Sequence, residues 1–376
     1  MTAVAGLLAV AASALSVPAA ASGGTPHLSK PTGPHSIGTT SLHLTDTSRP
    51  DPWVPEEERE LMVSLWYPAK PSGGPRAQYM TPTESELMLK HGGITGLPYD
   101  VLSTTRTNAV KDATPTGRTR GLPLVVLSPG YTKSRKTLTG LAEDLASHGY
   151  VVAAVDHTYE NPATTFPDGR VATCASCEIP HDPTFWDKLE AGRAVDISFV
   201  LDELTGAQQK WARLIDPARI AMAGHSVGGA SAMTAMLADS RLRAGIDVDG
   251  VTHTPIPDTG LSRPFLFMGR ESAYTPGTPN AFSWERDWPH LTGWKRWLVV
   301  SGVTHASFTD VGLLGEQLGL DGGAELPAAR ATEITRRYTR AFFDLHLGNR
   351  PQPLLDTPSP RYPEVKFCAV ETKTCE

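Results

Sequence analysis

The residues with the clearest chemical meaning are Gly224-His-Ser-Val-Gly228, which place a serine between two glycines at the spacing G-x-S-x-G. This pattern is typical of a nucleophilic serine on a sharp turn between a strand and a helix. The apolar run 220–223 predicts the strand, and the small residues of 229–238 predict the helix. Glycines two residues before and after Ser226 would let other backbone come close to the turn. The alternative is a glycine-rich turn in an α/β domain without activity.

A serine hydroxyl becomes a good nucleophile when a base takes its proton and a carboxylate orients that base. In folds with this turn, the partners follow in the order Ser, Asp or Glu, His, each in a loop after a later strand. Asp249 ends the predicted strand 245–249, and His305 follows the predicted strand 297–301. We therefore predict that Ser226, Asp249 and His305 are the catalytic residues.

Other acidic residues and histidines compete for the same roles. Asp247 lies two residues before Asp249, so both side chains would point to one face of the strand. Asp249 is favoured because it stands at the carboxyl end of that strand, where this kind of fold places its site. His305 is favoured as the base over three other candidates, which are His157, His253 and His290. We interpret His157 as a hydrogen-bonded supporting residue, and His225 as a residue that packs beside the turn.

Acyl transfer also needs two backbone N–H groups to bind the negatively charged oxygen of the tetrahedral intermediate. Val227 directly follows the serine and offers one N–H group at the start of the predicted helix. The loop after the predicted strand 122–128 offers the other, with Tyr131 as the donor. This chemistry uses no cofactor and no metal ion, and we predict neither.

These residues must be positioned by alternating strands and helices. Apolar runs predict strands at 122–128, 150–155, 220–223, 245–249, 264–268 and 297–301, and apolar residues at helical spacing predict helices near 138–145, 194–204 and 331–347. Continuous apolar strands between helices indicate a parallel sheet that is covered on both faces. We predict an α/β fold with a doubly wound, mostly parallel sheet and a single catalytic domain at 61–350. Residues 23–60 are predicted as an extended N-terminal segment, and 351–376 as a C-terminal tail.

The first 22 residues form an apolar, alanine-rich run that ends in small residues. Such a run predicts a signal peptide at 1–22, although no Lys or Arg precedes the apolar part; the alternative is a membrane anchor. The cysteines agree with export, because disulfides persist in oxidising compartments. We prefer two local disulfides over the other pairings and over a zinc site of four thiolates, and the proposed pairs are Cys174–Cys177 and Cys368–Cys375. The predicted location is extracellular.

Charge and aromatic content bear on the partners. The 376-residue chain has a net charge of −6 and no basic stripe, so we expect no nucleic-acid partner. The expected partner is a small-molecule or lipid ester, with transient contact to a lipid surface; the oligomeric state is left open. Trp284 and Trp288 lie in the segment before the strand that delivers His305. We predict that these two tryptophans line the acyl pocket or touch lipid, the alternative being that they only pack on the domain.

Several blocks of sequence resemble the platelet-activating-factor acetylhydrolase family of α/β-hydrolases. Besides the serine turn they are Leu65-Trp-Tyr-Pro-Ala69, the segment 144–157, Gly245-Ile-Asp-Val-Asp249 and Val303-Thr-His-Ala-Ser-Phe-Thr-Asp310, and together they span roughly 40–347. The resemblance implies an α/β-hydrolase fold and the roles already given to Ser226, Asp249, His305, Tyr131 and Val227. It departs at Ser128-Pro-Gly-Tyr131, where the family leads us to expect Ser-His-Gly and then an apolar residue.

The resemblance also implies an activity. It predicts a secreted serine carboxylic-ester hydrolase that acts through an acyl-enzyme on lipid or short-acyl esters. The main alternative is a broad lipase or polyester hydrolase. A serine peptidase and a non-catalytic binding module on the same fold are further alternatives. The binding module is disfavoured because all three members of the triad are present.

Overall fold

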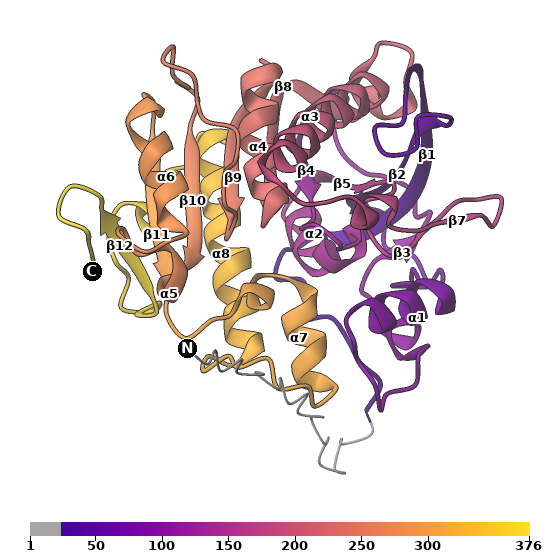
Figure 1. Ribbon diagram of the computed structural model, residues 1–376. Coiled ribbons are helices and arrows are strands. Elements are labelled where there is room, and N and C mark those ends of the chain that lie inside the picture. The colour runs from indigo at the N-terminus through magenta and orange to yellow at the C-terminus, as the bar shows by residue number, and fades with distance from the viewer. Residues whose placement is uncertain (1–23) are drawn as a thin grey trace, which may run out of the picture.

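An eleven-stranded mixed sheet organises the computed structural model, which describes residues 24–376 (Figure 1). The predicted signal peptide therefore lies outside the described residues. The strands of this sheet are β1 Ser36–Pro50, β2 Glu58–Ala69, β3 Val110–Lys111, β4 Leu122–Ser128, β5 Val151–His157, β8 Ile215–His225, β9 Leu242–Val248, β10 Phe265–Arg270, β11 Lys295–Val300, β12 Val365–Ala369 and β13 Thr374–Cys375. The strands β6 Thr164–Thr165 and β7 Val171–Ala172 form a separate hairpin.

The centre of the sheet is parallel, in the order β5-β4-β8-β9-β10-β11. Antiparallel strands extend it at both edges, with β2 and β1 beside β5, and β12 and β13 beside β11. The chain places β5 on one side of β4 and the strands from β8 to β11 on the other. In sheets of this kind, a crevice for ligands forms outside the carboxyl ends of the strands where the winding direction reverses. The segments that follow β4 and β8 both begin at that position.

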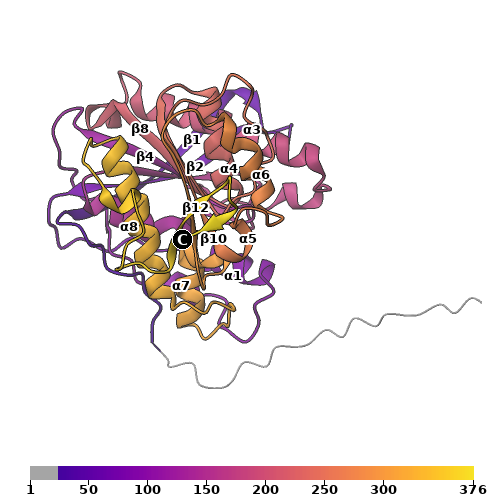
Figure 2. The ribbon, with the colours of Figure 1, turned by 90° about the vertical axis from the view of Figure 1, so that its left-hand side faces the viewer.

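Helices cover both faces of the sheet, as Figure 2 shows with α8 on one side and α3, α4 and α6 on the other. None of the helices in residues 24–376 is long and apolar enough to cross a bilayer. The predicted doubly wound, mostly parallel α/β sheet is confirmed. The helices are α1 Pro82–His91, α2 Thr139–Ser147, α3 Pro183–Thr205, α4 Val227–Ala238, α5 Glu271–Tyr274, α6 Ala281–Asp287, α7 Asp310–Gln317 and α8 Ala328–His346.

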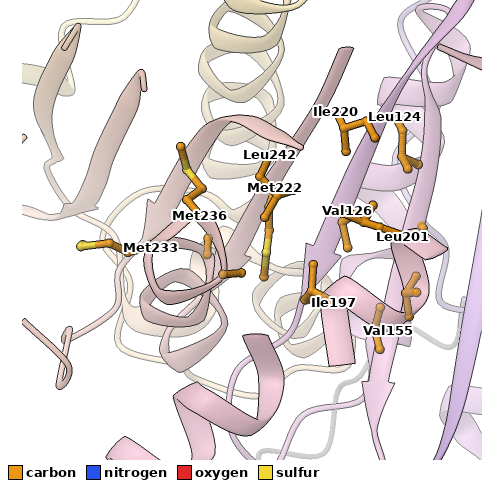
Figure 3. Packing of buried hydrophobic residues seen from close by; sticks show 14 of the residues in the cluster. Leu124, Val126, Val155, Ile197, Leu201, Ile220, Met222, Met233, Met236 and Leu242 are labelled. Atoms are coloured by element: carbon orange, nitrogen blue, oxygen red, sulfur yellow. The ribbon is translucent and has the colours of Figure 1, made fainter. Parts of the chain in front are cut away.

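The central strands are apolar along their whole length because both of their faces are buried. On β4, Leu124 and Val126 pack with α3 and α4, while Val125 and Leu127 pack with α2 and α8. Figure 3 shows the first of these two layers, in which Ile197 of α3 lies near the strand residues. Each fully buried Val, Leu or Ile contributes about 1.5–3 kcal/mol of favourable transfer free energy. This packing holds the carboxyl ends of β4 and β8 in fixed positions.

Two of the predicted terminal segments contain strands of the sheet, which the sequence did not indicate. Residues 36–50, within the segment 23–60 predicted as extended, form β1 and pair antiparallel with β2. The expected tail 351–376 contributes β12, which pairs with β11. β1 is rich in Ser and Thr, and only partly buried, so its composition resembles that of a loop. Its backbone groups are satisfied by a neighbouring strand, which composition alone does not reveal.

Candidate active site

Ser226 lies on the sharp turn between β8 and α4 with φ 57° and ψ −132°. A non-glycine residue in such a conformation costs on the order of 1–3 kcal/mol, and the surrounding structure must hold it there. A Cβ on Gly224 would come within 2.0 Å of the Gly228 backbone, and one on Gly228 within 2.1 Å of the Ser128 carbonyl oxygen. The spacing of the two glycines therefore follows from the close approach of three backbone segments.

The structure brings Asp249 and His305 together beside the serine. His305 Nδ1 lies 2.5 Å from Asp249 Oδ2, and Asp249 Oδ1 accepts the backbone N–H of Arg270 at 2.8 Å. Asp249 directly follows β9 and is buried, whereas the His305 side chain is 42% exposed at the start of a 3₁₀ turn. The buried carboxylate thus fixes one ring nitrogen of His305 and leaves the other for chemistry in the cavity.

Ser226, Asp249 and His305 line one cavity of about 310 Å³. In the described part of the chain, no hydrogen bond joins Ser226 Oγ to His305 Nε2. Such bonds are often long in unliganded enzymes and tighten when substrate binds. The arrangement therefore fits a nucleophile, a base and a carboxylate that orients the base.

Asp247, the competing acidic residue, lies in a different environment. Its Oδ1 accepts the backbone N–H of Gly250 at 3.0 Å. Burial, together with the neighbouring Asp249 carboxylate, raises the pKa of Asp247 well above its ordinary value. A neutral carboxyl group at this position would not stabilise a protonated histidine, so the geometry and the charge both favour Asp249.

The two expected oxyanion donors also line the cavity. Within residues 24–376, neither the N–H of Tyr131 nor that of Val227 has a hydrogen-bond acceptor. Val227 is the first residue of α4, where backbone N–H groups lack partners inside the helix. Two unpaired N–H groups beside the serine can bind a developing oxyanion.

The side chain of Tyr131 is held by the loop that follows β7. Its hydroxyl lies 3.2 Å from Ser176 Oγ and 3.0 Å from His181 Nε2. A disulfide within this loop limits its conformations. Both predicted disulfides are confirmed, and because they use all four thiols the zinc alternative is wrong; the pairs are Cys174–Cys177 and Cys368–Cys375.

His225, which precedes the serine, packs beside the turn as expected and also contacts His305. Its Nε2 lies 2.8 Å from the backbone oxygen of His305, and the two rings are 4.4 Å apart. Burial, with the His305 charge as a smaller cause, lowers the pKa of His225 well below its ordinary value. The neutral ring can therefore donate its Nε2–H to that oxygen and support the backbone of His305.

The sequence did not indicate the aromatic wall of the cavity. Trp186 of α3 stacks on His253 with ring centres 5.1 Å apart and an angle of 11°. His253 Nδ1 lies 2.8 Å from the buried Glu190 carboxylate, which also accepts the backbone N–H of His253. Trp186 and Glu190 are four residues apart and so share a face of α3. The amino-acid sequence shows this spacing, but it does not show that the segment of His253 packs against that face.

The predicted aromatic rim at Trp284 and Trp288 is wrong. Trp284 is fully buried and stacks on Phe267 and Tyr274, with ring centres 4.5 and 4.1 Å away. Its Nε1–H donates to the Gly250 carbonyl oxygen at 2.6 Å. Trp288 packs beside it against the same core and does not line the cavity. Helix α6 turns Trp284 toward the sheet and leaves Phe282 exposed, and Trp288 lies in the 3₁₀ turn that follows the helix.

Replacing Trp284 with alanine should therefore reduce stability. We expect the free energy of unfolding to fall by about 3–5 kcal/mol, because a large buried ring leaves a cavity and an unpaired carbonyl oxygen. Denaturant titration measures this change. The matched control is Phe282→Ala, since Phe282 is 69% exposed on the same helix and should change stability little. A Trp284→Ala protein with wild-type stability and a selective loss on emulsified esters would restore the surface role.

The chain is similar to one protein family and to several known proteins. The family model described as "Platelet-activating factor acetylhydrolase, isoform II" matches residues 20–173 and 187–352. A probable 1-alkyl-2-acetylglycerophosphocholine esterase from Arthroderma benhamiae is 30% identical, with 90% of this chain and 93% of that protein covered. The platelet-activating factor acetylhydrolase of Cavia porcellus is 23% identical, with 85% and 78% covered. A solved ferulic acid esterase from Streptomyces cinnamoneus is 46% identical, covers 92% of this chain and 100% of its own, and superposes with a TM-score of 0.83.

Proposed function

Because the chain belongs to the platelet-activating factor acetylhydrolase, isoform II, family of α/β-hydrolases, we propose that Ser226 hydrolyses esters through a covalent acyl-enzyme. That the chain is a carboxylic-ester hydrolase follows from its family and its relatives. The observation that supports the serine mechanism is the His305–Asp249 hydrogen bond in the cavity that Ser226 also lines. We assign the roles of nucleophile, base and orienting carboxylate to Ser226, His305 and Asp249.

In the first half of the proposed reaction, Ser226 Oγ attacks the ester carbonyl carbon while His305 Nε2 takes its proton. The carbonyl oxygen becomes an oxyanion, which the N–H groups of Tyr131 and Val227 bind. His305 then gives the proton to the leaving alkoxide as the ester C–O bond breaks. This step releases an alcohol and leaves the acyl group on Ser226.

In the second half, water attacks the acyl-enzyme while His305 takes a proton from it. The second tetrahedral intermediate collapses, His305 returns the proton to Ser226, and a carboxylic acid leaves. Asp249 keeps Nδ1 of His305 protonated and stabilises the imidazolium that forms twice in each cycle. Labelling with a fluorophosphonate, followed by peptide mass spectrometry, tests this proposal: the adduct should lie on Ser226, and an adduct on another serine would contradict it.

The cavity supports a substrate with a small acyl group. Its volume of about 310 Å³ is at the low end for small-molecule pockets. One relative is named for an alkyl-acetyl glycerophosphocholine ester, whose acetyl group is a short acyl group. Another is named for ferulic acid, whose acyl group is planar and aromatic. We propose short-acyl esters, including those of lipids, as substrates. The stacked Trp186–His253 wall specifically favours aromatic acyl esters as a second class.

Rates on a series of p-nitrophenyl esters test this substrate class. We expect kcat/KM for the acetate and the ferulate to exceed that for the palmitate by at least about tenfold. Trp186→Ala should lower kcat/KM for the ferulate by up to about tenfold, the worth of one aromatic contact, and spare the acetate. Trp288→Ala, outside the cavity, is the control. Equal rates on acetate and palmitate, or activity on polyester film, would favour the broad lipase or polyester hydrolase instead.

We also propose that the protein is exported. Two disulfides support an oxidising destination, and the apolar run at 1–22 supports a cleaved signal. N-terminal sequencing of protein recovered from the culture medium should place the mature start near residue 22 or 23. A protein that stays in the cell with its first residues intact would contradict export.

A further inference from the structure

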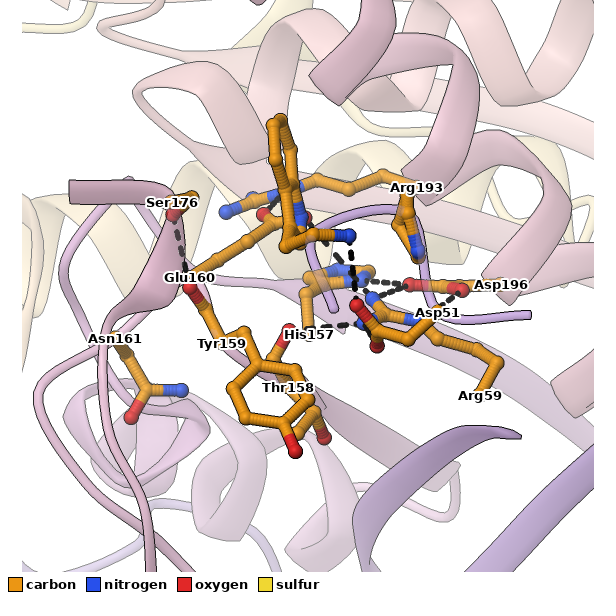
Figure 4. A network of polar contacts seen from close by, with 12 residues as sticks. Asp51, Arg59, His157, Thr158, Tyr159, Glu160, Asn161, Ser176, Arg193 and Asp196 are labelled. Atoms are coloured by element: carbon orange, nitrogen blue, oxygen red, sulfur yellow. Dashed lines mark hydrogen bonds and ion pairs between the residues drawn. The ribbon is translucent and has the colours of Figure 1, made fainter. Parts of the chain in front are cut away.

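The loop that carries Tyr131 rests on a buried network of charged and polar side chains from four separate parts of the chain. Figure 4 shows Arg59 of β2, His157 at the end of β5, Glu160 just beyond it, and Arg193 and Asp196 of α3. Each of these side chains is at most 2% exposed. Burying charges at this depth is costly unless each is paired and hydrogen-bonded. Solubility at the surface therefore cannot explain why these charged residues are present, and a role inside the protein has to be sought.

Arg193 and Glu160 hold both ends of the loop. Arg193 Nη1 donates to the Pro129 carbonyl oxygen at 2.6 Å, and Arg193 Nε donates to Glu160 Oε2 at 2.7 Å. The backbone carbonyl oxygen of Glu160 accepts the N–H of Thr132 at 2.9 Å. The segment between Pro129 and Thr132 is thus attached at each end to one ion pair. The unpaired N–H of Tyr131 lies between those attachments.

A second chain of hydrogen bonds fixes Ser128, the last residue of β4. Ser128 Oγ lies 3.0 Å from His157 Nε2, and His157 Nδ1 lies 2.7 Å from Asp196 Oδ2. Burial, with the Arg193 charge as a smaller cause, lowers the pKa of His157 below its ordinary value, so the ring is neutral. Nδ1–H then donates to Asp196 while Nε2 accepts the Ser128 O–H. Ser128 Oγ is left to accept from Arg193 Nη1, which lies 3.2 Å away.

The chain of hydrogen bonds from Asp196 through His157 to Ser128 connects the same residue types as a serine-hydrolase triad. It is not a second active site, because these three residues are at most 1% exposed and substrate cannot reach them. Asp196 is also held by Arg59, whose Nη2 donates to it at 2.6 Å. Burial alone would raise the pKa of Asp196, but the Arg59 charge and the His157 hydrogen bond keep it below its ordinary value. The chain of bonds therefore ends in a carboxylate that is fully paired.

We propose that Arg193, Glu160, His157 and Ser128, here called the loop clamp, position the N–H of Tyr131 to bind the oxyanion, an inference that rests on the proposed function. Oxyanion donors act only when they are already 2.7–3.1 Å from where the oxygen will lie. A donor in an irregular loop has no helix to fix it, and buried bonds at both ends of the loop supply that rigidity. The loop clamp residues are positioning residues, since none contacts the reacting atoms.

Ser128→Ala is the mildest test, because it removes the hydroxyl and keeps the bonds from Arg193 to Pro129 and Glu160. We expect kcat to fall about tenfold with little change in KM, as removing a whole oxyanion donor costs about 10²–10³. Affinity for a trifluoromethyl ketone, which forms the tetrahedral oxyanion, should fall by the same factor as kcat. A purely structural role would lower stability without this matched loss.

Substitutions of Arg193 should have a larger effect on kcat, and a conservative substitution at the same position should restore part of it. Arg193→Gln should lower kcat by about 10²-fold, the loss expected when the donor is displaced, whereas Arg193→Lys keeps the charge beside Glu160 and should recover part of the rate. Tyr150→Phe is the matched control, since Tyr150 loses one buried hydrogen bond of 2.7 Å to Asp344 at the opposite end of β5. It should reduce stability by about 1 kcal/mol and leave kcat unchanged.

The outcomes separate the loop clamp from the proposed function. If a fluorophosphonate labels no serine of the cavity in the wild-type protein, the serine mechanism itself fails. If it labels Ser226 and both Ser128→Ala and Arg193→Gln keep wild-type kcat and ketone affinity, only the loop clamp is overturned. If kcat falls in these variants while ketone affinity is unchanged, the network acts on another step and the inference also fails.

Discussion

Replacing Ser226 with alanine is expected to lower kcat on p-nitrophenyl acetate by about 10⁴-fold or more. The variant keeps the Cβ and the strained backbone of the turn but has no oxygen to attack the ester. His305, Asp249 and the two N–H groups stay in place, so binding of the ester, and hence KM, should change little. The remaining rate would come from water attacking an ester that these groups still hold.

Steady-state rates and active-site titration measure this effect, and a thermal melt checks that the fold is intact. Ser147→Ala is a suitable control, because Ser147 is a buried serine of α2 whose hydroxyl bonds only nearby backbone groups. Wild-type labelling of the Ser226→Ala protein by a fluorophosphonate, or a rate within tenfold of wild type, would show that another residue is the nucleophile.

Asp249→Asn is expected to lower kcat by about 10⁴-fold. The carboxylate accepts a hydrogen bond from His305 Nδ1, which keeps the proton off Nε2 and leaves that nitrogen able to act as a base. An asparagine can turn its NH₂ group toward the ring, favour the wrong tautomer and remove the negative charge that stabilises the imidazolium. Its oxygen can still accept the N–H of Arg270, so the loop should remain folded.

Asp247→Asn is the matched variant and should keep nearly wild-type activity. Burial and the neighbouring Asp249 carboxylate raise the pKa of Asp247 well above its ordinary value, which favours the neutral carboxyl group, and an amide of the same shape keeps the Gly250 hydrogen bond. Measuring kcat for both variants decides between the two acidic residues. A crippled Asp247→Asn protein beside an active Asp249→Asn protein would reverse the assignment.

The turn that carries Ser226 could be predicted from sequence because its constraints act within a few residues. Gly224 and Gly228 stand where a Cβ would collide with backbone, and the apolar strand and small-residue helix flank them. The positions of Asp249 and His305 followed from the rule that partners come after later parallel strands. The strands before these two residues could be predicted from their own sequences, because strands that are buried on both faces are continuous apolar runs.

The edges of the sheet and the walls of the cavity could not be predicted in this way. β1 and β12 are strands because neighbouring strands satisfy their backbone groups. β1 is rich in Ser and Thr, so its composition resembles that of a loop. The segment of Trp284 and the helix of Trp186 are both aromatic, yet the first packs into the core and the second lines the cavity. Which face of a helix meets the core, and which meets the site, depends on its neighbours.

The amino-acid sequence by itself determined the order of the central strands and the local turn that strains Ser226. Only the tertiary structure decided that Arg59, His157 and Asp196 are buried together, since Arg59 and Asp196 are 137 residues apart and His157 and Asp196 are 39 apart. In the sequence these are ordinary charged residues, most often found at the surface. Charges become a positioning network only where packing excludes water and brings their partners within hydrogen-bond distance, and that condition depends on the whole chain.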